Sequence, residues 1–165
     1  WYLDPEEGGG RIIGEVCHFV DLLQFLTDST VVDVTAATPG SDPGTAAVPN
    51  ENLAATLRFA DGSVGTILYT DLGHNRFPKE RLEVFAGGKV VVLDNFNSLE
   101  LYGRRGRRQV NCRHDKGHRD EVAAFLAAVA DGSESPIDVP GLLHTSEVVF
   151  RIIEACRAAP RDSGS

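Results

Sequence analysis

Short stretches of alternating apolar and polar residues recur through the middle of the chain, and two-residue turns join them. Leu53 to Phe59 carries an apolar residue at every second position, and Asp61-Gly62 follows it as a hairpin signal. Gly87-Gly88 separates a second pair of such stretches, which spans Leu82 to Leu93. Because turns this short connect neighbouring antiparallel strands, the pattern predicts an antiparallel sheet.

Helical periodicity lies on both sides of this strand-rich middle. Apolar residues recur three or four positions apart from Arg11 to about Asp28, from His118 to Asp131 and from Leu142 to Ala158. The other predicted segments are strands at Thr30–Ala37, Ser63–Thr70, Ser98–Tyr102 and Gln109–Arg113, and a loop at Pro39–Pro49. This order predicts an α+β fold, with helices on one face of an open, mostly antiparallel β-sheet. We expect one domain over residues 1–160 and a disordered tail over 161–165.

Composition argues against several classes of protein. A formal charge of −8 supplies no positive field for nucleic acid, and no apolar run approaches the roughly 20 residues that span a bilayer. Cys17, Cys112 and Cys156 are odd in number and form no CxxC pair, which predicts free thiols in a reducing cytoplasm. The chain begins at Trp1 and contains no methionine, so we expect an excised domain, a processed product or a chain whose natural start is missing.

The first predicted helix carries the residues best suited to chemistry. Glu15, His18 and Asp21 are spaced three apart, and residues three apart share a helix face. A carboxylate beside a histidine favours the charged imidazole and fixes its orientation, which suits a general base that removes a hydroxyl proton. The alternative from spacing alone is a histidine that satisfies a hydrogen bond in the core.

No segment of the chain predicts a dinucleotide site. A GxGxxG loop that follows a strand and opens a helix is absent, and no strand pattern leads into Gly8-Gly9-Gly10.

The glycine-rich loop that leads into a helix with His18 and, three residues later, Asp21 resembles the start of the C-terminal domain of Gfo/Idh/MocA oxidoreductases. Leu57–Gly65 and Lys79–Gly88 resemble the family's next strands and turns, and Glu121–Asp131 and the final helix resemble its closing helices. The sequence segments GEVCHFVDLL and PKERLEVFAGG resemble those of a subgroup related to zinc-type alcohol dehydrogenase fusions. The resemblance also implies the C-terminal domain fold that glyceraldehyde-3-phosphate dehydrogenase shares.

This resemblance implies an enzyme, an NAD(P)-dependent oxidoreductase whose NAD or NADP binds to an upstream Rossmann domain absent from this chain. The implied reaction is hydride transfer between the nicotinamide and a hydroxyl carbon of a sugar, nucleotide sugar or cyclitol. His18 is implied as the active-site histidine, with Glu15 as a second catalytic residue. The fragment alone is expected to be inactive. The alternative is a non-catalytic oligomerisation or ligand-binding module with the same fold.

One position departs from the family pattern. Many members carry an acidic residue four positions before the histidine, where this chain has Gly14, and the acid here is Glu15. A shift of one residue turns a side chain by about 100° around an α-helix. Glu15 lies three residues from His18, so we expect it still to reach the polar stripe.

The resemblance also places the loop at residues 71–79 near the substrate. We therefore expect His74, Asn75 and Arg76, together with Asp21 and His118, to contact a sugar-like small molecule. Plain solvent exposure is the alternative for the loop residues.

Two other clusters have simpler explanations. Cys112, His114 and His118 lack a fourth ligand for zinc, so no metal site is predicted. Arg104–Arg108 is predicted to be a hairpin tip, although arginine can also bind phosphate.

The outer face of the predicted sheet is mixed in character. Strands Leu53–Phe59 and Ser63–Thr70 place Thr, Ala, Gly and Ile there. Such a face suits a second copy of the chain, so we expect a homo-oligomer through this open face; a solvated face is the alternative.

Overall fold

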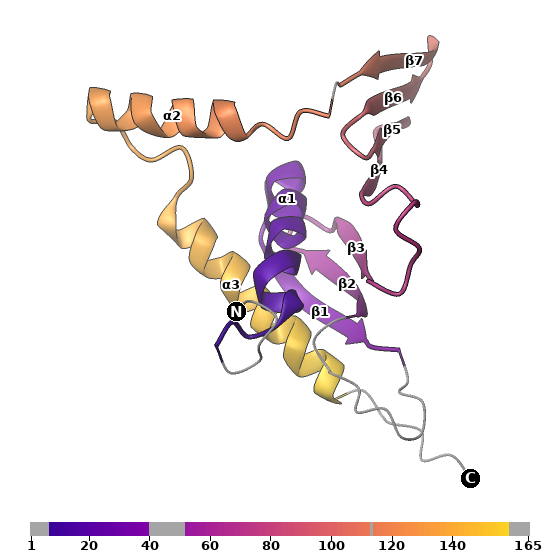
Figure 1. Ribbon diagram of the computed structural model, residues 1–165, viewed down its shortest axis with the longest axis vertical. Helices are drawn as coiled ribbons and strands as arrows, with labels where there is room; N and C mark the ends of the chain where they lie inside the picture. Colours follow the sequence, from indigo (N-terminus) through magenta and orange to yellow (C-terminus); the bar gives the residue numbers. More distant parts are fainter. Residues whose placement is uncertain (1–6, 40–51, 113, 159–165) are drawn as a thin grey trace. The chain divides into compact units, whose positions relative to one another are not determined.

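The computed structural model describes residues 7–39, 52–112 and 114–158 of the chain (Figure 1). The chain divides into two compact units. The first comprises residues 1–72 and 137–165, and the second comprises residues 73–136. The predicted loop residues 40–49 and the predicted tail at 161–165 lie outside the described residues.

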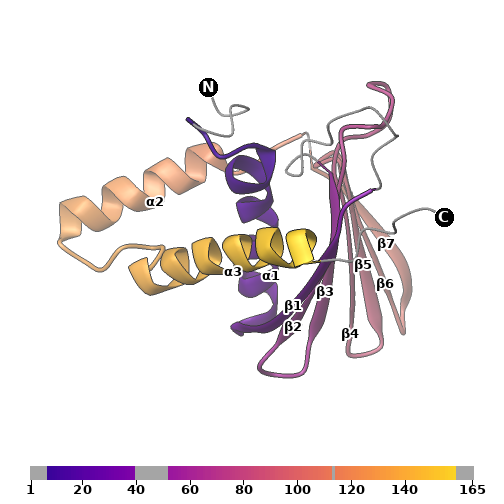
Figure 2. The ribbon, with the colours of Figure 1, turned by 90° about the horizontal axis from the view of Figure 1, so that it is seen from below.

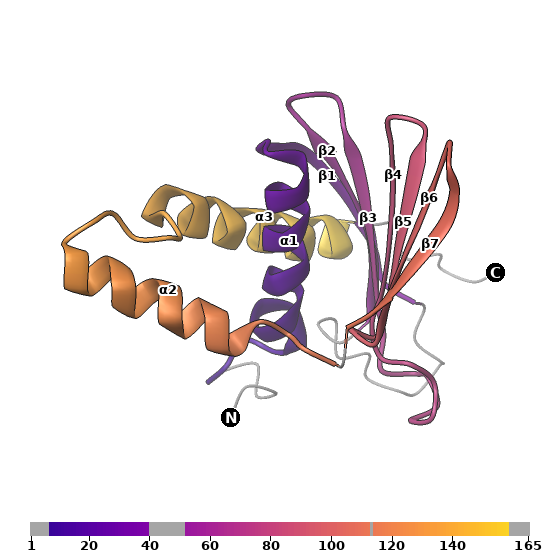
Figure 3. The ribbon, with the colours of Figure 1, turned by 90° about the horizontal axis from the view of Figure 1, so that it is seen from above.

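The first unit is a three-stranded antiparallel sheet with helices on one face. Its elements are η1 (Ile12–Val16), α1 (Cys17–Thr27), β1 (Val31–Ala37), β2 (Leu53–Phe59), β3 (Val64–Tyr69) and α3 (Val139–Ala158). The strand order is β1-β2-β3, with β2 in the centre. Figures 2 and 3 show α1 and α3 on the same side of this sheet.

The core of the first unit follows from the alternation in β2. Every second residue of the strand is buried, from Leu53 at one end to Phe59 at the other. The helices cover these side chains with Ile12, Val16, Val20, Val148, Val149, Ile152 and Ile153. Burying one such aliphatic side chain contributes about 1.5–3 kcal/mol, so this interface supplies most of the unit's stability.

Polar contacts fix α3 against the rest of the unit. His144 Nε2 accepts a hydrogen bond from the backbone N–H of Val31 at 3.1 Å, where β1 begins. Gln24 on α1 donates to the Thr145 hydroxyl at 2.7 Å. Asp138 caps the start of α3, because its carboxylate accepts the N–H of Gly141 at 3.0 Å. The helix therefore begins at Val139, three residues before the predicted start.

The second unit contains a four-stranded antiparallel sheet and one helix. Its elements are β4 (Arg81–Ala86), β5 (Lys89–Asp94), β6 (Ser98–Gly103), β7 (Gly106–Asn111) and α2 (His118–Asp131), and the strand order is β4-β5-β6-β7. Gly87 and Gly88 both have positive φ, as a tight two-residue hairpin requires. Among the described hydrophobic residues of this unit, Ala128 alone is buried.

The predicted α+β class and antiparallel pairing are confirmed, and two details differ. The strands form two sheets rather than one open sheet, because no pairing joins β3 to β4 in the described residues. The last hairpin was predicted with a tip at residues 104–108, which is wrong, since Gly103 pairs with Gly106. Arg104 and Arg105 make the turn, and Arg107 and Arg108 lie in β7. The single domain over residues 1–160 stays a prediction.

Of the helices in the described residues, none combines the length and apolar character needed to cross a membrane.

Candidate active site on the first helix

A wide turn shapes the start of the first helix. Residues Ile12–Val16 form a π-helical turn that continues directly into α1. Across this turn the buried side chains are four residues apart, at Ile12, Val16 and Val20. The wide turn therefore arranges the flanking side chains in rows with a four-residue spacing. Such turns often occur at functional sites.

One row faces outward and contains His18. Gly14, His18, Asp21 and Phe25 are all exposed, one turn after another. A Cβ built on Gly14 would meet no atom within 4 Å, so the space before His18 is open. Over the described part of the chain, the His18 imidazole makes no hydrogen bond or ion pair to another side chain. The ring is thus available to a molecule outside this unit.

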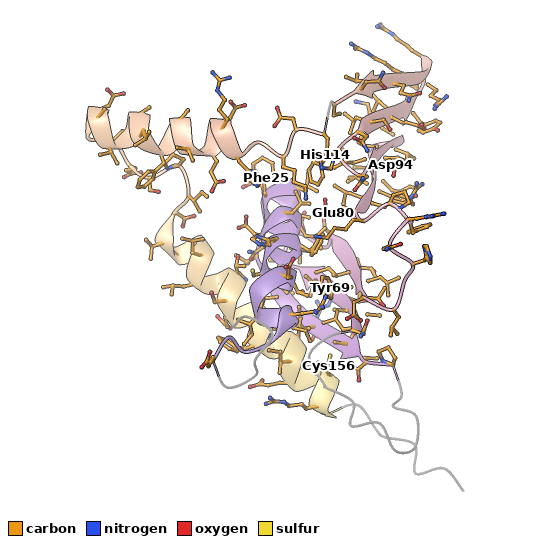
Figure 4. All side chains as sticks on the ribbon, in the orientation of Figure 1. Phe25, Tyr69, Glu80, Asp94, His114 and Cys156 are labelled. Carbon is orange, nitrogen blue, oxygen red and sulfur yellow. The ribbon has the colours of Figure 1, made fainter. Side chains whose placement is uncertain are left out.

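A neighbouring row, Arg11, Glu15 and Phe19, faces Tyr69 at the end of β3. The rings of Phe19 and Tyr69 lie with their centroids 6.3 Å apart. Arg11 hydrogen-bonds the Tyr69 side chain, and its guanidinium lies 3.6 Å from the Asp71 carboxylate. Figure 4 shows Tyr69 on its strand beside the first helix.

The structure therefore divides the predicted polar stripe between two rows. His18 and Asp21 share the exposed row, whereas Glu15 lies beside Tyr69. No hydrogen bond joins Glu15 to His18 among the residues described. The physical reason is the wide turn, which changes the angular step per residue just where Glu15 stands. The catalytic roles of His18 and Glu15 stay predictions.

Burial and acidic neighbours shift two pKa values here. Burial raises the pKa of Tyr69, and the charge of Glu15 raises it further, while the Arg11 hydrogen bond opposes both. Burial likewise raises the pKa of the Cys17 thiol, with smaller contributions from Glu15 and Asp21. Both groups are therefore protonated at neutral pH.

Asn52 holds the end of β3 beside this row. Its side-chain oxygen accepts hydrogen bonds from the Thr70 hydroxyl at 2.7 Å and from the Asp71 N–H at 2.9 Å. Asp71 is thereby fixed through its backbone as well as through its ion pair with Arg11.

The predicted substrate loop belongs to the second unit. His74 Nδ1 accepts a hydrogen bond from the Arg76 N–H at 3.2 Å, so a neutral His74 ring carries its proton on Nε2. Asn75 and Arg76 are exposed, and the Arg76 guanidinium has no ion pair with a described residue. The loop thus presents hydrogen-bond donors to solvent.

The remaining candidates do not assemble into sites. His118 is the first residue of α2 and is exposed. His114 Nδ1 lies 3.0 Å from the Asn95 carbonyl oxygen, and the described residues contain no group of three side chains able to hold a metal ion. Arg107 is paired with Glu100 at 2.5 Å, so this arginine of the predicted basic tip is already neutralised. All three cysteines are free.

Arg11, Tyr69 and Asp71 were not predicted as site residues. The four-residue spacing of Arg11, Glu15 and Phe19 could have revealed Arg11, because residues four apart share a helix face. Tyr69 and Asp71 lie at the end of β3, far away in the sequence, so no local pattern could have revealed them.

NAD or NADP is the cofactor that the family resemblance implies, and the described residues do not fit it. A pyrophosphate cradle needs free space beside glycine at a strand-to-helix turn. A Cβ on Gly9 would lie 2.5 Å from Ile13 Cδ1, so this chain's own side chain fills that space. In the described stretch before η1, residues 7–10 form a turn and no strand.

Comparisons with known proteins agree with this fold. The TM-score is 0.73 to UDP-N-acetylglucosamine 3-dehydrogenase GnnA from Acidithiobacillus ferrooxidans (22% identity, 86% of this chain, 45% of that chain). The TM-score is 0.77 to an NAD binding oxidoreductase from Klebsiella pneumoniae (17% identity, 97% of this chain, 52% of that chain). The TM-score is 0.71 to an oxidoreductase from Agrobacterium radiobacter in complex with NAD+, L-tartaric acid and magnesium (16% identity, 88% of this chain, 46% of that chain).

The chain spans about half the length of these solved structures. A family model described as the GFO/IDH/MocA C-terminal domain matches residues 1–108, which is well over half of the chain. The chain therefore belongs to the GFO/IDH/MocA family, as a C-terminal domain of that family.

Proposed function

We propose that this chain is the substrate-side domain of an NAD(P)-dependent oxidoreductase. The full protein would act on a hydroxyl carbon of a sugar, nucleotide sugar or cyclitol. The observation that carries the proposal is the exposed His18 imidazole, which has no partner among the described residues and stands on the first helix of a chain from this family.

In this proposal His18 handles the proton. A nicotinamide held by a domain outside this chain would supply the hydride acceptor or donor for the carbinol carbon. The hydroxyl proton passes to an imidazole nitrogen of His18 as the carbonyl forms, and returns to the oxygen in the reverse direction. Asp21 lies one turn further along the same exposed row.

For the second unit, taken by itself, we propose sugar-binding residues. The exposed donors of His74, Asn75 and Arg76, and the His118 ring, suit the oxygens of a sugar. The relative named UDP-N-acetylglucosamine 3-dehydrogenase supports a nucleotide sugar as one substrate class. Three free thiols support a cytoplasmic setting.

Replacing His18 by alanine in the full-length protein tests the proposal. Loss of a positioned acid or base should lower kcat by about 10²- to 10⁴-fold. The measurement is nicotinamide absorbance with a panel of nucleotide sugars, free sugars and inositols. His114→Ala is the control, because that histidine is exposed and lies in the second unit, where its Nδ1 is 3.0 Å from the Asn95 carbonyl oxygen. Unchanged turnover in His18→Ala would remove His18 from the mechanism.

A second candidate is a ligand-binding module without chemistry. The observation in its favour is Gly14, which leaves open space where many family members carry an acid. Oxidation of no compound in the panel by the full-length protein, with retained sugar binding, would favour this alternative.

We also propose a homo-oligomer through the outer face of the first unit's sheet. Within the first unit, the helices lie on the opposite face of the sheet (Figure 3). Leu68 and Val64 on β3 are 76% and 65% exposed, although both are large apolar residues. Exposed apolar side chains on an uncovered sheet are typical of an interface.

A further inference from the structure

Arg11, Glu15, Tyr69 and Asp71 form a polar group, here called the Tyr69 cluster, that the proton transfer proposed for His18 does not use. Their side chains are only partly accessible, with 29% exposure for Arg11 and 31% for Asp71. All four belong to the first unit. The Phe19 ring packs beside Tyr69, and Phe19 directly follows His18 in the helix.

Hydrogen-bond capacity defines what the cluster can hold. A guanidinium only donates, so Arg11 is the donor in its hydrogen bond with Tyr69, and the phenol O–H can donate to another acceptor. The Glu15 carboxylate beside it only accepts. A donor and an acceptor side by side match a neutral hydroxyl, which accepts one hydrogen bond and donates another.

The charges of the cluster oppose an anionic ligand. Arg11 carries one positive charge, and Glu15 and Asp71 carry two negative charges between them. Arg11 already lies 3.6 Å from Asp71, so its charge is largely compensated. A carboxylate on the substrate ring that meets the cluster would add a further negative charge to this surplus and be repelled.

The position of the cluster suits a ligand that also reaches His18. Glu15 and His18 are three residues apart on adjacent rows, and three residues of α-helix rise by about 4.5 Å. A single pyranose or cyclitol ring spans that separation between its hydroxyl groups.

We propose that the Tyr69 cluster binds an uncharged hydroxyl of the substrate ring and selects neutral polyols over uronates, while His18 transfers the proton. This inference rests on the proposed function. It assigns Tyr69 as a substrate-contacting residue and Arg11 and Asp71 as positioning residues. Glu15 then contacts the substrate and makes no contact with His18.

The raised pKa of Tyr69 supports this role. Burial and the Glu15 charge keep the phenol protonated through neutral pH, so Tyr69 remains a donor under assay conditions.

The test uses the full-length protein and two matched pairs, D-glucose with D-glucuronate and UDP-glucose with UDP-glucuronate. Binding is measured by calorimetry and turnover by nicotinamide absorbance, so affinity is obtained even without hydride transfer. Wild type should bind the neutral member at least about tenfold more tightly. Tyr69→Phe should weaken binding of the neutral member about fivefold, which is the value of one hydrogen bond. Glu15→Gln should lower the ratio of neutral to uronate affinity, because it removes a negative charge that repels the uronate carboxylate.

Tyr102→Phe is the matched control, because Tyr102 also lies beside a glutamate and an arginine, Glu100 and Arg107, but on a hairpin of the second unit. This control variant should leave the ratio of neutral to uronate affinity unchanged. Absence of binding for both pairs, equal affinity in wild type, or an unchanged ratio in both Tyr69→Phe and Glu15→Gln would overturn the inference. Loss of turnover in His18→Ala with the ratio preserved supports both proposals. Turnover that survives His18→Ala, with a ratio that responds to Tyr69→Phe, overturns the proposed mechanism alone.

Discussion

Gly14 and His18 stand one turn apart on the exposed row of the first helix, and nothing fills the space above Gly14. In this chain the acid one position later faces Tyr69 instead. The imidazole therefore lacks a carboxylate on the preceding turn, and Asp21 on the following turn is the acid that shares its row.

Restoring an acid at position 14 gives a direct prediction. Gly14→Asp should fold normally, because its backbone has no positive φ and its Cβ has room. The new carboxylate lies four residues before His18 and stabilises the imidazolium. The acid limb of the kcat/KM profile of the full-length enzyme should consequently move to higher pH. Gly14→Asn is the neutral control, and an identical shift in both variants would contradict an electrostatic cause.

Cys17 gives a second prediction at the scale of single residues. Its pKa is raised by burial and by the charges of Glu15 and Asp21, so little thiolate is present near pH 8. Iodoacetamide should modify Cys17 more slowly in the folded chain than in the urea-unfolded chain. Glu15→Gln should speed the reaction in the folded state, because it removes one charge that raises the pKa. Mass spectrometry in a background without Cys112 and Cys156 measures both rates.

Residue identity was easier to predict than residue orientation. The sequence pattern correctly placed His18 on a helix and Asp21 on the same exposed side. It placed Glu15 with them on the assumption of 3.6 residues per turn, which the wide turn at Ile12–Val16 breaks. Tyr69 approaches through tertiary packing between α1 and β3, and no local pattern contains that information.

At the scale of elements, close contact between α1 and β3 depends on Gly65. A Cβ built there would lie 2.8 Å from Leu23 Cδ1 and 3.4 Å from Phe59 Cε2. A side chain at this position would therefore displace the end of the Leu23 side chain or push α1 away from β3.

Gly65→Val tests this contact. Overpacking of this kind costs about 1–3 kcal/mol, and the free energy of unfolding in urea should fall by that amount. Gly103→Val is the control, because the nearest atom to a Cβ there is Lys89 Cγ at 3.7 Å. Equal stability of the two variants would show that α1 adjusts without strain.

The elements themselves were largely predictable because turn chemistry and alternation are local. Asp61-Gly62 and Gly87-Gly88 marked both hairpins at the correct positions. The start of β7 was missed, because Arg107 and Arg108 resemble a solvated tip unless the partner Glu100 is known. The break between the two sheets was missed as well, since alternation predicts strands and not which strands pair.

At the scale of the whole molecule, the proposed oligomer can be tested through Leu68. Leu68→Lys places a charge on the open face of the first sheet, and burying that charge in an interface is unfavourable. The mass of the full-length protein, measured by light scattering after size exclusion, should fall toward that of one chain. Leu143→Lys is the control, since Leu143 is 66% exposed on α3. An unchanged mass in Leu68→Lys would show that the interface lies elsewhere.

The second unit has little interior of its own, with Ala128 its single buried hydrophobic residue in the described stretch. Burial of apolar surface within the unit contributes little free energy of folding. The folding stability of residues 73–136 therefore depends on the molecules that they bind. A ligand that engages His74 or Arg76 would therefore also act as a folding effector. Substrate concentration would then set not only the rate of turnover but also the lifetime of the surface that receives the substrate.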